Sequence, residues 1–246
     1  MLVGMDDDRM FAVLDASIAD LAGVGVDDLD RPVPACEGWD VSRLLSHVGR
    51  VHRWVIGVLE AGPGGDAPVP ARRPDDVSPL DWFADGAATL RSSFDAVDLD
   101  VVYPTWIGDQ QARWWLRRQV QETAVHAWDG RDARGRGDEG LDPDVAVDGI
   151  DELLDVFLRL RFDHAAFGAA GESMHLHATD VDGEWLITFE SGGVPTVRRE
   201  HAKGDVAARG TASDLLLFLW SRRRPETLDV FGDATLLTRY QNFATY

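Results

Sequence analysis

The sequence contains a single cysteine, Cys36, and this scarcity limits the sites that the chain can build. One thiol forms no internal disulfide and supplies no multi-cysteine zinc or iron–sulfur site. Lysine and asparagine are equally rare, since Lys203 and Asn242 are the only examples. Because both amino acids have AT-rich codons, the composition indicates a GC-rich gene.

Positive charge is also scarce, because 43 acidic residues outnumber 24 Lys and Arg and give a formal net charge of -19. Phosphate backbones and anionic membrane surfaces repel such a chain, so we expect neither nucleic acid nor a membrane as partner. No apolar run approaches the roughly 20 residues of a membrane span. Asp6, Asp7 and Asp8 stand where a signal peptide would be basic, so we expect a cytoplasmic protein.

The first half of the chain has the periodicity of helices. Apolar residues recur at steps of three and four, which predicts helices over about residues 7–21, 40–59, 78–97 and 109–134. Asp40, Ser78 and Asp109 are the expected helix N-caps, and a short extended piece is expected at 101–106. Four helices with long connections predict a four-helix bundle.

The second half changes its period. A fifth helix is expected over about 145–161, and the alternation that follows predicts a hairpin over 174–189. Further strands are expected at 194–200 and 206–209, then a helix from Thr211 or Ser213 to Trp220 and a last helix from Asp233. The predicted fold class is therefore α+β, with a helical bundle over 1–140 and a small α+β domain over 141–246.

The sharpest constellation of side chains is His47, Glu122 and His126. Glu122 and His126 are four residues apart, so they differ by only about 40° around the axis of their helix. His47 lies with Leu44 and Val48 in the apolar stripe of the second predicted helix. Together they would form a His/Glu/His set across two helices, which is a ligand set of open zinc sites. A buried Glu–His hydrogen bond or two solvated residues would give the same spacing.

Two neighbouring residues bear on this set. His52 follows His47 by five residues, about 140° around the helix, so both cannot easily face one centre, and we favour His47 as the ligand. Asp129 lies one turn beyond His126 and could orient that imidazole from outside the ligand set. A helix-end charge near Arg131 explains Asp129 equally well.

The remaining candidates are weaker. Cys36 lies eleven residues before His47, about 16 Å along a helix, so we expect a small buried residue rather than a fourth ligand. His175 and His177 alternate to one strand face and could bind a metal as a pair, but we favour a solvated or domain-facing pair. The tryptophans expected to pack the bundle are Trp114, Trp115 and Trp128.

Four blocks of sequence stand out, in chain order CEGWDVSRLLSHVGRVHRW, RWWLRRQVQETAVHAWDGRDA, HLHATDVDGEWLITFE and RGTASDLLLFLWSRR. Together these blocks resemble the mycothiol-dependent maleylpyruvate isomerase family. The resemblance runs from about residue 8 to 242, and the four blocks in series make it specific. It implies a DinB-like metal-binding bundle followed by a domain similar to sterol carrier proteins. A GC-rich gene also suits actinobacteria, the group that makes mycothiol.

The resemblance also implies the cofactors and their ligands. The family holds a divalent metal, usually zinc, through positions that match His47, Glu122 and His126, and coordination to such an ion deprotonates a bound thiol. In the family's isomerase the thiolate adds to an activated cis double bond, the adduct rotates, and elimination gives the trans product. Without elimination, the same site acts as a thiol S-transferase.

An arginine completes the site that the family resemblance implies. Arg222 matches the family's catalytic arginine, which would bind a substrate carboxylate from the C-terminal side of the cleft between the domains. Arg223 and Arg224 adjoin it, so the position could be shifted by one or two residues. A basic helix C-terminus that interacts with its own dipole is an equally good explanation.

We therefore expect a metal-dependent enzyme that uses mycothiol to isomerise a small anionic electrophile of the maleylpyruvate type, or to add the thiol to it. The expected partners are that small-molecule substrate and the low-molecular-weight thiol, and the expected assembly is a monomer or weak homodimer. The alternative is a non-enzymatic, metal-containing bundle whose C-terminal domain carries an apolar ligand.

Overall fold

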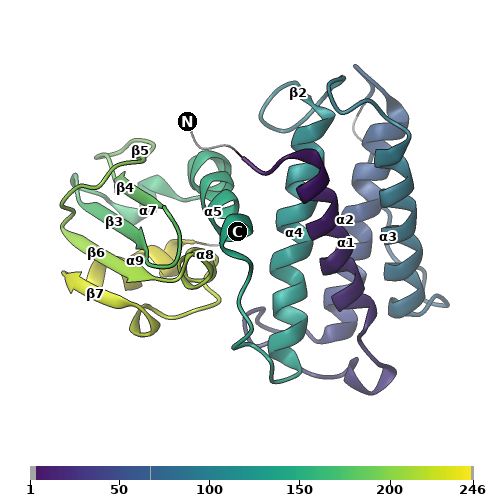
Figure 1. Cartoon of the computed structure of the whole chain (residues 1–246), viewed down its shortest axis with the longest axis horizontal. Helices are drawn as coiled ribbons and strands as arrows, with labels where there is room; N and C mark the ends of the chain where they lie inside the picture. Colours follow the sequence, from purple (N-terminus) through teal and green to yellow (C-terminus); the bar gives the residue numbers. More distant parts are fainter. Residues whose placement is uncertain (1–3, 67, 245–246) are drawn as a thin grey trace. The chain divides into compact units, whose positions relative to one another are not determined.

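The computed structural model describes residues 4–66 and 68–244, and the chain divides into two compact units, Met1–Glu139 and Gly140–Tyr246 (Figure 1). The first unit is helical apart from a two-stranded ladder, and the second combines a five-stranded sheet with helices. This confirms the predicted α+β class. Within the described ranges, no helix is both long enough and apolar enough to cross a membrane.

Four long helices build the first unit. They are α1 (Asp7–Ala22), α2 (Val41–Ala61), α3 (Pro79–Asp95) and α4 (Ala112–Ala133), with a 3-10 turn, η1 (Val26–Asp28), after α1. Asp40 accepts a hydrogen bond from the backbone N–H of Arg43, and Ser78 accepts one from that of Asp81. Both are therefore the predicted N-caps, since each satisfies an N–H group that the first helical turn leaves free.

The predicted start of the fourth helix at Asp109 is wrong. The strand β1 (Val102–Tyr103) pairs antiparallel with β2 (Gln110–Gln111), and α4 begins only after this ladder, with Gln111 at its N-cap. The ladder keeps residues 110–111 extended. Pairing with an earlier segment thus overrides the local capping signal of Asp109.

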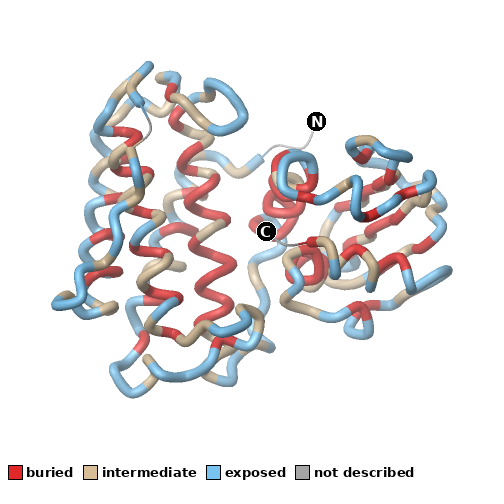
Figure 2. Tube along the Cα trace, turned by 180° about the vertical axis from the view of Figure 1, so that it is seen from behind, coloured by how far each residue is buried: buried red, intermediate tan, exposed pale blue. Residues whose placement is uncertain are grey.

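The core of the first unit lies between the four helices. Figure 2 shows that α4 is buried along most of its length. Trp115 and Trp128 are buried in the bundle as predicted, with 1% and 2% of their surface exposed, whereas Trp114 is only partly buried. Fully buried side chains from the other helices complete the core: Leu14, Leu21, Leu44, Leu45, Phe83 and Leu90.

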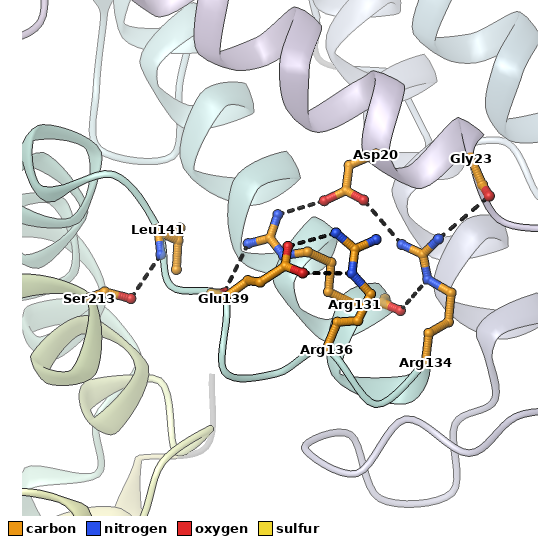
Figure 3. A network of polar contacts seen from close by, with 9 residues as sticks. Asp20, Gly23, Arg131, Arg134, Arg136, Glu139, Leu141 and Ser213 are labelled. Atoms are coloured by element: carbon orange, nitrogen blue, oxygen red, sulfur yellow. Dashed lines mark hydrogen bonds and ion pairs between the residues drawn. The ribbon is translucent and has the colours of Figure 1, made fainter.

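Ion pairs fix the C-terminal end of α4, as Figure 3 shows. Arg131 and Arg134 both pair with Asp20 of α1, at 2.5 and 3.1 Å. The pair with Asp20 accounts for the position of Arg131, so a contact with Asp129 is not needed to explain it. At the start of the second unit, the backbone N–H of Leu141 donates a hydrogen bond of 2.9 Å to the hydroxyl of Ser213.

The second unit begins with α5 (Pro143–Glu152), which continues as a π-helical turn, η2 (Leu153–Phe157), and then α6 (Leu158–Leu160). One regular helix was predicted over this stretch, so the helix is in the right place but contains a widened turn. A short unpredicted helix, α7 (His164–Phe167), follows. Thr211 caps α8 (Ala212–Leu219) as predicted, and α9 (Thr235–Phe243) begins two residues after the predicted Asp233.

The sheet of the second unit has the strand order β5-β4-β3-β6-β7. Its strands are β3 (Ser173–Ala178), β4 (Glu184–Thr188), β5 (Thr196–Arg198), β6 (Val206–Gly210) and β7 (Asp229–Gly232). The predicted hairpin is β3–β4, and only the β3–β6 pair is parallel among the pairings described. The edge strand β7, preceded by the 3-10 turn η3 (Pro225–Thr227), was not predicted.

The two faces of this sheet have different chemistry. Met174 and Leu176 are fully buried, and α8 packs against their strand. Trp185 pairs with Leu176 across the hairpin and donates a hydrogen bond of 2.8 Å from its indole N–H to Asp151 of α5. Because neighbouring residues of a strand point to opposite faces, the residues between them, beginning with His175, lie on the other face.

Candidate metal centre

The first unit brings His47 of α2 together with Glu122 and His126 of α4. The Nε2 atom of His47 lies 3.0 Å from Oε1 of Glu122, and Nε2 of His126 lies 3.4 Å from the same oxygen. The three ligand atoms are all within 4.8 Å of one another. Two imidazole nitrogens from different helices therefore converge on one carboxylate oxygen.

Two buried side chains form hydrogen bonds with Glu122 and His126. Arg118 donates a hydrogen bond of 2.7 Å to Oε2 of Glu122, and Asp129 accepts one of 2.8 Å at Nδ1 of His126. Arg118 is 3% exposed and Asp129 is completely buried. Arg118 was not predicted as part of the site, although its opposite charge four residues before Glu122 is a usable sequence signal.

Trp39 lines the same cluster and was also missed. Its indole lies 4.9 Å from the ring of His47 and 6.2 Å from that of His126, centroid to centroid. Trp39 directly precedes Asp40, the N-cap of α2, so the capped helix start places the indole beside the two imidazoles. No periodic pattern in the sequence marks a residue in such a connection.

The electrostatics of the cluster favour charged forms. Burial disfavours protonation of His126, but its hydrogen bonds to Asp129 and Glu122 outweigh burial and raise its pKa to about 9. Burial likewise disfavours the Glu122 carboxylate, yet hydrogen bonds from His126 and His47 hold its pKa well below the ordinary value. The cluster thus pairs an anionic carboxylate with positive charge.

The donor set fits a divalent metal ion. Two imidazole nitrogens and one carboxylate oxygen are the protein ligands of many open zinc sites. Zinc ligands are usually oriented by hydrogen-bonding partners outside the coordination sphere, and Asp129 and Arg118 contact His126 and Glu122 in a way that would suit such a role.

His52 lies apart from this cluster. Its Nε2 atom is 3.1 Å from the hydroxyl of Thr123, and burial lowers its pKa to about 3. His52 is fully buried, whereas 34% of the His47 side chain is exposed, although the sequence places His47 in the apolar stripe of this helix. His47 is nevertheless the α2 histidine that contacts Glu122.

Cys36 lies closer to the cluster than the sequence suggested. Its sulfur is 3.8 Å from Oδ2 of Asp129, and the residue is half-buried rather than buried. The expected distance of Cys36 from His47 assumed that the chain between them is helical. Instead the chain folds back before α2, where the backbone N–H of Val33 donates a hydrogen bond to the carbonyl of Trp39. Cys36 therefore approaches Asp129 and is not one of the three grouped ligands.

The three arginines after α8 have different surroundings. Arg222 donates a hydrogen bond of 2.9 Å to the carbonyl of Trp220, and its guanidinium lies 5.9 Å from that indole ring. Arg223 forms an ion pair of 3.1 Å with Asp214. Arg224 is exposed at the start of η3. A carboxylate of the protein thus already holds Arg223.

Of the two expected arrangements of His175 and His177, solvated or domain-facing, the solvated one is wrong for His175. Only 5% of His175 is exposed, and its Nε2 atom lies 3.2 Å from Glu184. Burial lowers the pKa of His175 in spite of this carboxylate. The hairpin register brings Glu184 beside both histidines, which strand alternation alone does not reveal.

Two family models match consecutive parts of the chain. The mycothiol maleylpyruvate isomerase N-terminal domain matches residues 11–130, and the C-terminal domain of the same family matches residues 144–239. No curated protein matches the sequence.

Two solved structures are similar over nearly their whole length. A histidine-to-alanine mutant of the mycothiol-dependent maleylpyruvate isomerase has a TM-score of 0.62 at 12% identity, over 93% of this chain and 95% of that one. The unmutated isomerase has a TM-score of 0.59 at 12% identity, over 88% and 91%. At this identity the likeness concerns the fold. Since the two family models follow one another and account for both units, the chain belongs to the mycothiol maleylpyruvate isomerase family, which is a family of enzymes.

Proposed function

We propose that this protein is a divalent-metal enzyme that uses mycothiol to isomerise a small anionic electrophile of the maleylpyruvate type, or to add the thiol to it. The observation that carries the proposal is the convergence of His47, Glu122 and His126 within 4.8 Å, in a chain of this family. Two solved relatives are named as mycothiol-dependent maleylpyruvate isomerases, which supports the choice of thiol and substrate class.

In this proposal His47, Glu122 and His126 hold the metal, and zinc is the ion that the donor set favours. Bound zinc would lower the pKa of the mycothiol thiol from its ordinary value near 8.5, so that thiolate is present at neutral pH. Three protein ligands leave a coordination position for that sulfur. Cys36 would not serve as the nucleophile, since its sulfur lies against the Asp129 carboxylate.

The other side chains of the cluster act on the ligands. Arg118 fixes one oxygen of Glu122 and so directs the other toward the imidazoles. Asp129 fixes Nδ1 of His126 and leaves Nε2 for the metal. Trp39 covers the cluster with an apolar ring, which would limit the access of water to the thiolate.

Arg222 is the proposed binder of the substrate carboxylate. A guanidinium can donate two parallel hydrogen bonds to a carboxylate, which an ammonium group cannot reproduce. Arg222 is chosen over Arg223 and Arg224 because its position resembles that of the family's catalytic arginine. An arginine selects an anion, and the maleylpyruvate type is taken from the relatives.

Calorimetric titration with mycothiol tests the proposal. The metal-loaded protein should bind mycothiol and turn over maleylpyruvate, whereas the metal-stripped protein should do neither. S-methylated mycothiol is the matched control ligand, because it keeps the sugar and inositol groups but has no ionisable thiol. Equal binding of mycothiol by the metal-stripped and metal-loaded proteins would overturn the mechanism. Binding of apolar ligands without any turnover would favour the non-enzymatic alternative.

A further inference from the structure

A second group of imidazoles surrounds a carboxylate on the sheet of the second unit, outside the proposed catalytic cluster. Three of the seven histidines of the chain, His175, His177 and His201, contact Glu184. The proposed function uses none of these four residues. Together they offer nitrogen and oxygen donors of the kind that bind transition metals.

The fold explains how the group assembles. The β3–β4 register sets His177 directly opposite Glu184, and His175 lies two residues along the same face. His201 comes from the connection between β5 and β6, and β5 borders β4 in the sheet. The sheet therefore gathers donors from two strands and a connection.

The distances separate an inner set from an outer partner. Two imidazole nitrogens lie close to Oε2 of Glu184. Nε2 of His175 is 3.2 Å from this oxygen, and Nδ1 of His201 is 2.7 Å from it. These three ligand atoms all lie within 4.8 Å of one another. His177 contacts the other oxygen, with its Nδ1 atom 2.8 Å from Oε1.

We propose that His175, Glu184 and His201 form a second metal site, which takes a divalent transition-metal ion of the zinc class, and that His177 positions Glu184 through its other oxygen. Two imidazoles and one carboxylate favour zinc, copper or nickel, because magnesium and calcium prefer oxygen ligands alone. The inner set has the same composition as the cluster in the bundle, but no residue is shared between them.

The burial of the ligands suggests how the site is filled and what it does. The side chain of His175 is 6% exposed and that of Glu184 is 22% exposed, so the sheet holds both in place. The His201 side chain is 80% exposed, so an ion can enter from solvent on that side. A bound ion would connect β3 and β4 to the segment after β5 and would stabilise the second unit.

Zinc titration of the tag-free, metal-stripped full chain tests this site. His201→Ala is the principal variant, because an exposed side chain can be removed without a change in the core. It should bind one zinc equivalent fewer than the wild type. His164→Ala is the matched control, since it removes a histidine of the same unit outside the cluster, and it should keep the wild-type stoichiometry.

Two further variants separate the roles of the residues. His177→Ala should weaken zinc binding at this site by about 10- to 100-fold, which is the usual cost of losing a partner outside the coordination sphere. His47→Ala should leave this site filled, because the proposed catalytic cluster is a separate set of residues. If His201→Ala bound zinc with the same stoichiometry and affinity as the wild type and His164→Ala, the second site would not exist. If His47→Ala bound no zinc at all, the second site would likewise be ruled out.

Discussion

Oδ2 of Asp129 accepts a hydrogen bond of 2.8 Å from Nδ1 of His126, one helical turn earlier on α4, and the Asp129 side chain is fully buried. A carboxylate on one ring nitrogen fixes the tautomer and the orientation of an imidazole, and it makes the other nitrogen a better metal ligand. The contact therefore prepares Nε2 of His126 for a cation.

Replacing this carboxylate should weaken metal binding without abolishing it. Asp129→Asn keeps the shape of the side chain and removes its charge, so we expect the zinc Kd to rise by about 10- to 100-fold. The measurement is zinc titration in a His201→Ala background, where the proposed sheet site cannot contribute. Asp85→Asn is the control, because that carboxylate is 77% exposed on α3. An unchanged Kd in a folded Asp129→Asn protein would contradict the positioning role.

Arg222→Lys should separate metal and thiol binding from turnover. The change keeps the positive charge but loses the planar fork that can hold a carboxylate through two hydrogen bonds. A charged hydrogen bond contributes about 1.5–3 kcal/mol, so we expect kcat/KM for maleylpyruvate to fall by about 10- to 100-fold. Zinc content and the Kd for mycothiol should stay at wild-type values.

Arg224→Lys is the matched control for this change, because Arg224 is exposed and only two residues away. It should leave kcat/KM unchanged. Normal turnover by Arg222→Lys, together with a loss in Arg224→Lys or Arg223→Lys, would move the carboxylate-binding role to the neighbouring residue.

Glu172 should make the stability of the second unit sensitive to acid. The backbone N–H of Ala170 donates to Glu172 at 2.6 Å and Arg239 of α9 pairs with it at 2.6 Å, which together lower its pKa from 4.5 to about 2. A carboxyl with a lower pKa in the folded state stabilises the fold above its unfolded pKa. This stabilisation is lost as the pH falls from about 4.5 to about 2.

Urea unfolding at about pH 6 and about pH 3 measures this effect. The free energy of unfolding should fall less between the two pH values in Glu172→Gln than in the wild type. Glu226→Gln, which removes an exposed carboxylate on η3, should keep the wild-type pH dependence. The same pH dependence in Glu172→Gln and the wild type would contradict the contribution of Glu172.

The sequence predicts those parts of the fold that local interactions decide. Asp40 and Ser78 cap their helices because a short side chain bonds to an N–H only three residues on. Asp109 misleads because residues 110–111 are held in a ladder with 102–103, a pairing that a local pattern does not encode. The strand β7 was not predicted because its sequence does not alternate between apolar and polar residues. Phe231 is apolar but 57% exposed at the edge of the sheet.

The two side-chain clusters differ in how far the sequence reveals them. The spacing of Glu122 and His126 puts both on one face of a helix, so only the pairing of α2 with α4 remained to bring in His47. The group around Glu184 depends on hairpin register and on a connection that returns His201 to the sheet. Neither is visible in the periodicity, which allowed a solvated or a domain-facing pair and gave no sign that His175 is buried beside Glu184.

The most direct test of the metal cluster compares two histidines of the same helix. His47→Ala and His52→Ala remove rings five residues apart on α2, one beside Glu122 and one beside Thr123. Zinc titration of each metal-stripped protein, with folding checked by circular dichroism, should show that His47→Ala binds one equivalent fewer than the wild type. His52→Ala should bind the wild-type amount. Retention of all zinc by a folded His47→Ala protein, or loss of one equivalent only in His52→Ala, would contradict the assignment of His47, Glu122 and His126 as the metal ligands.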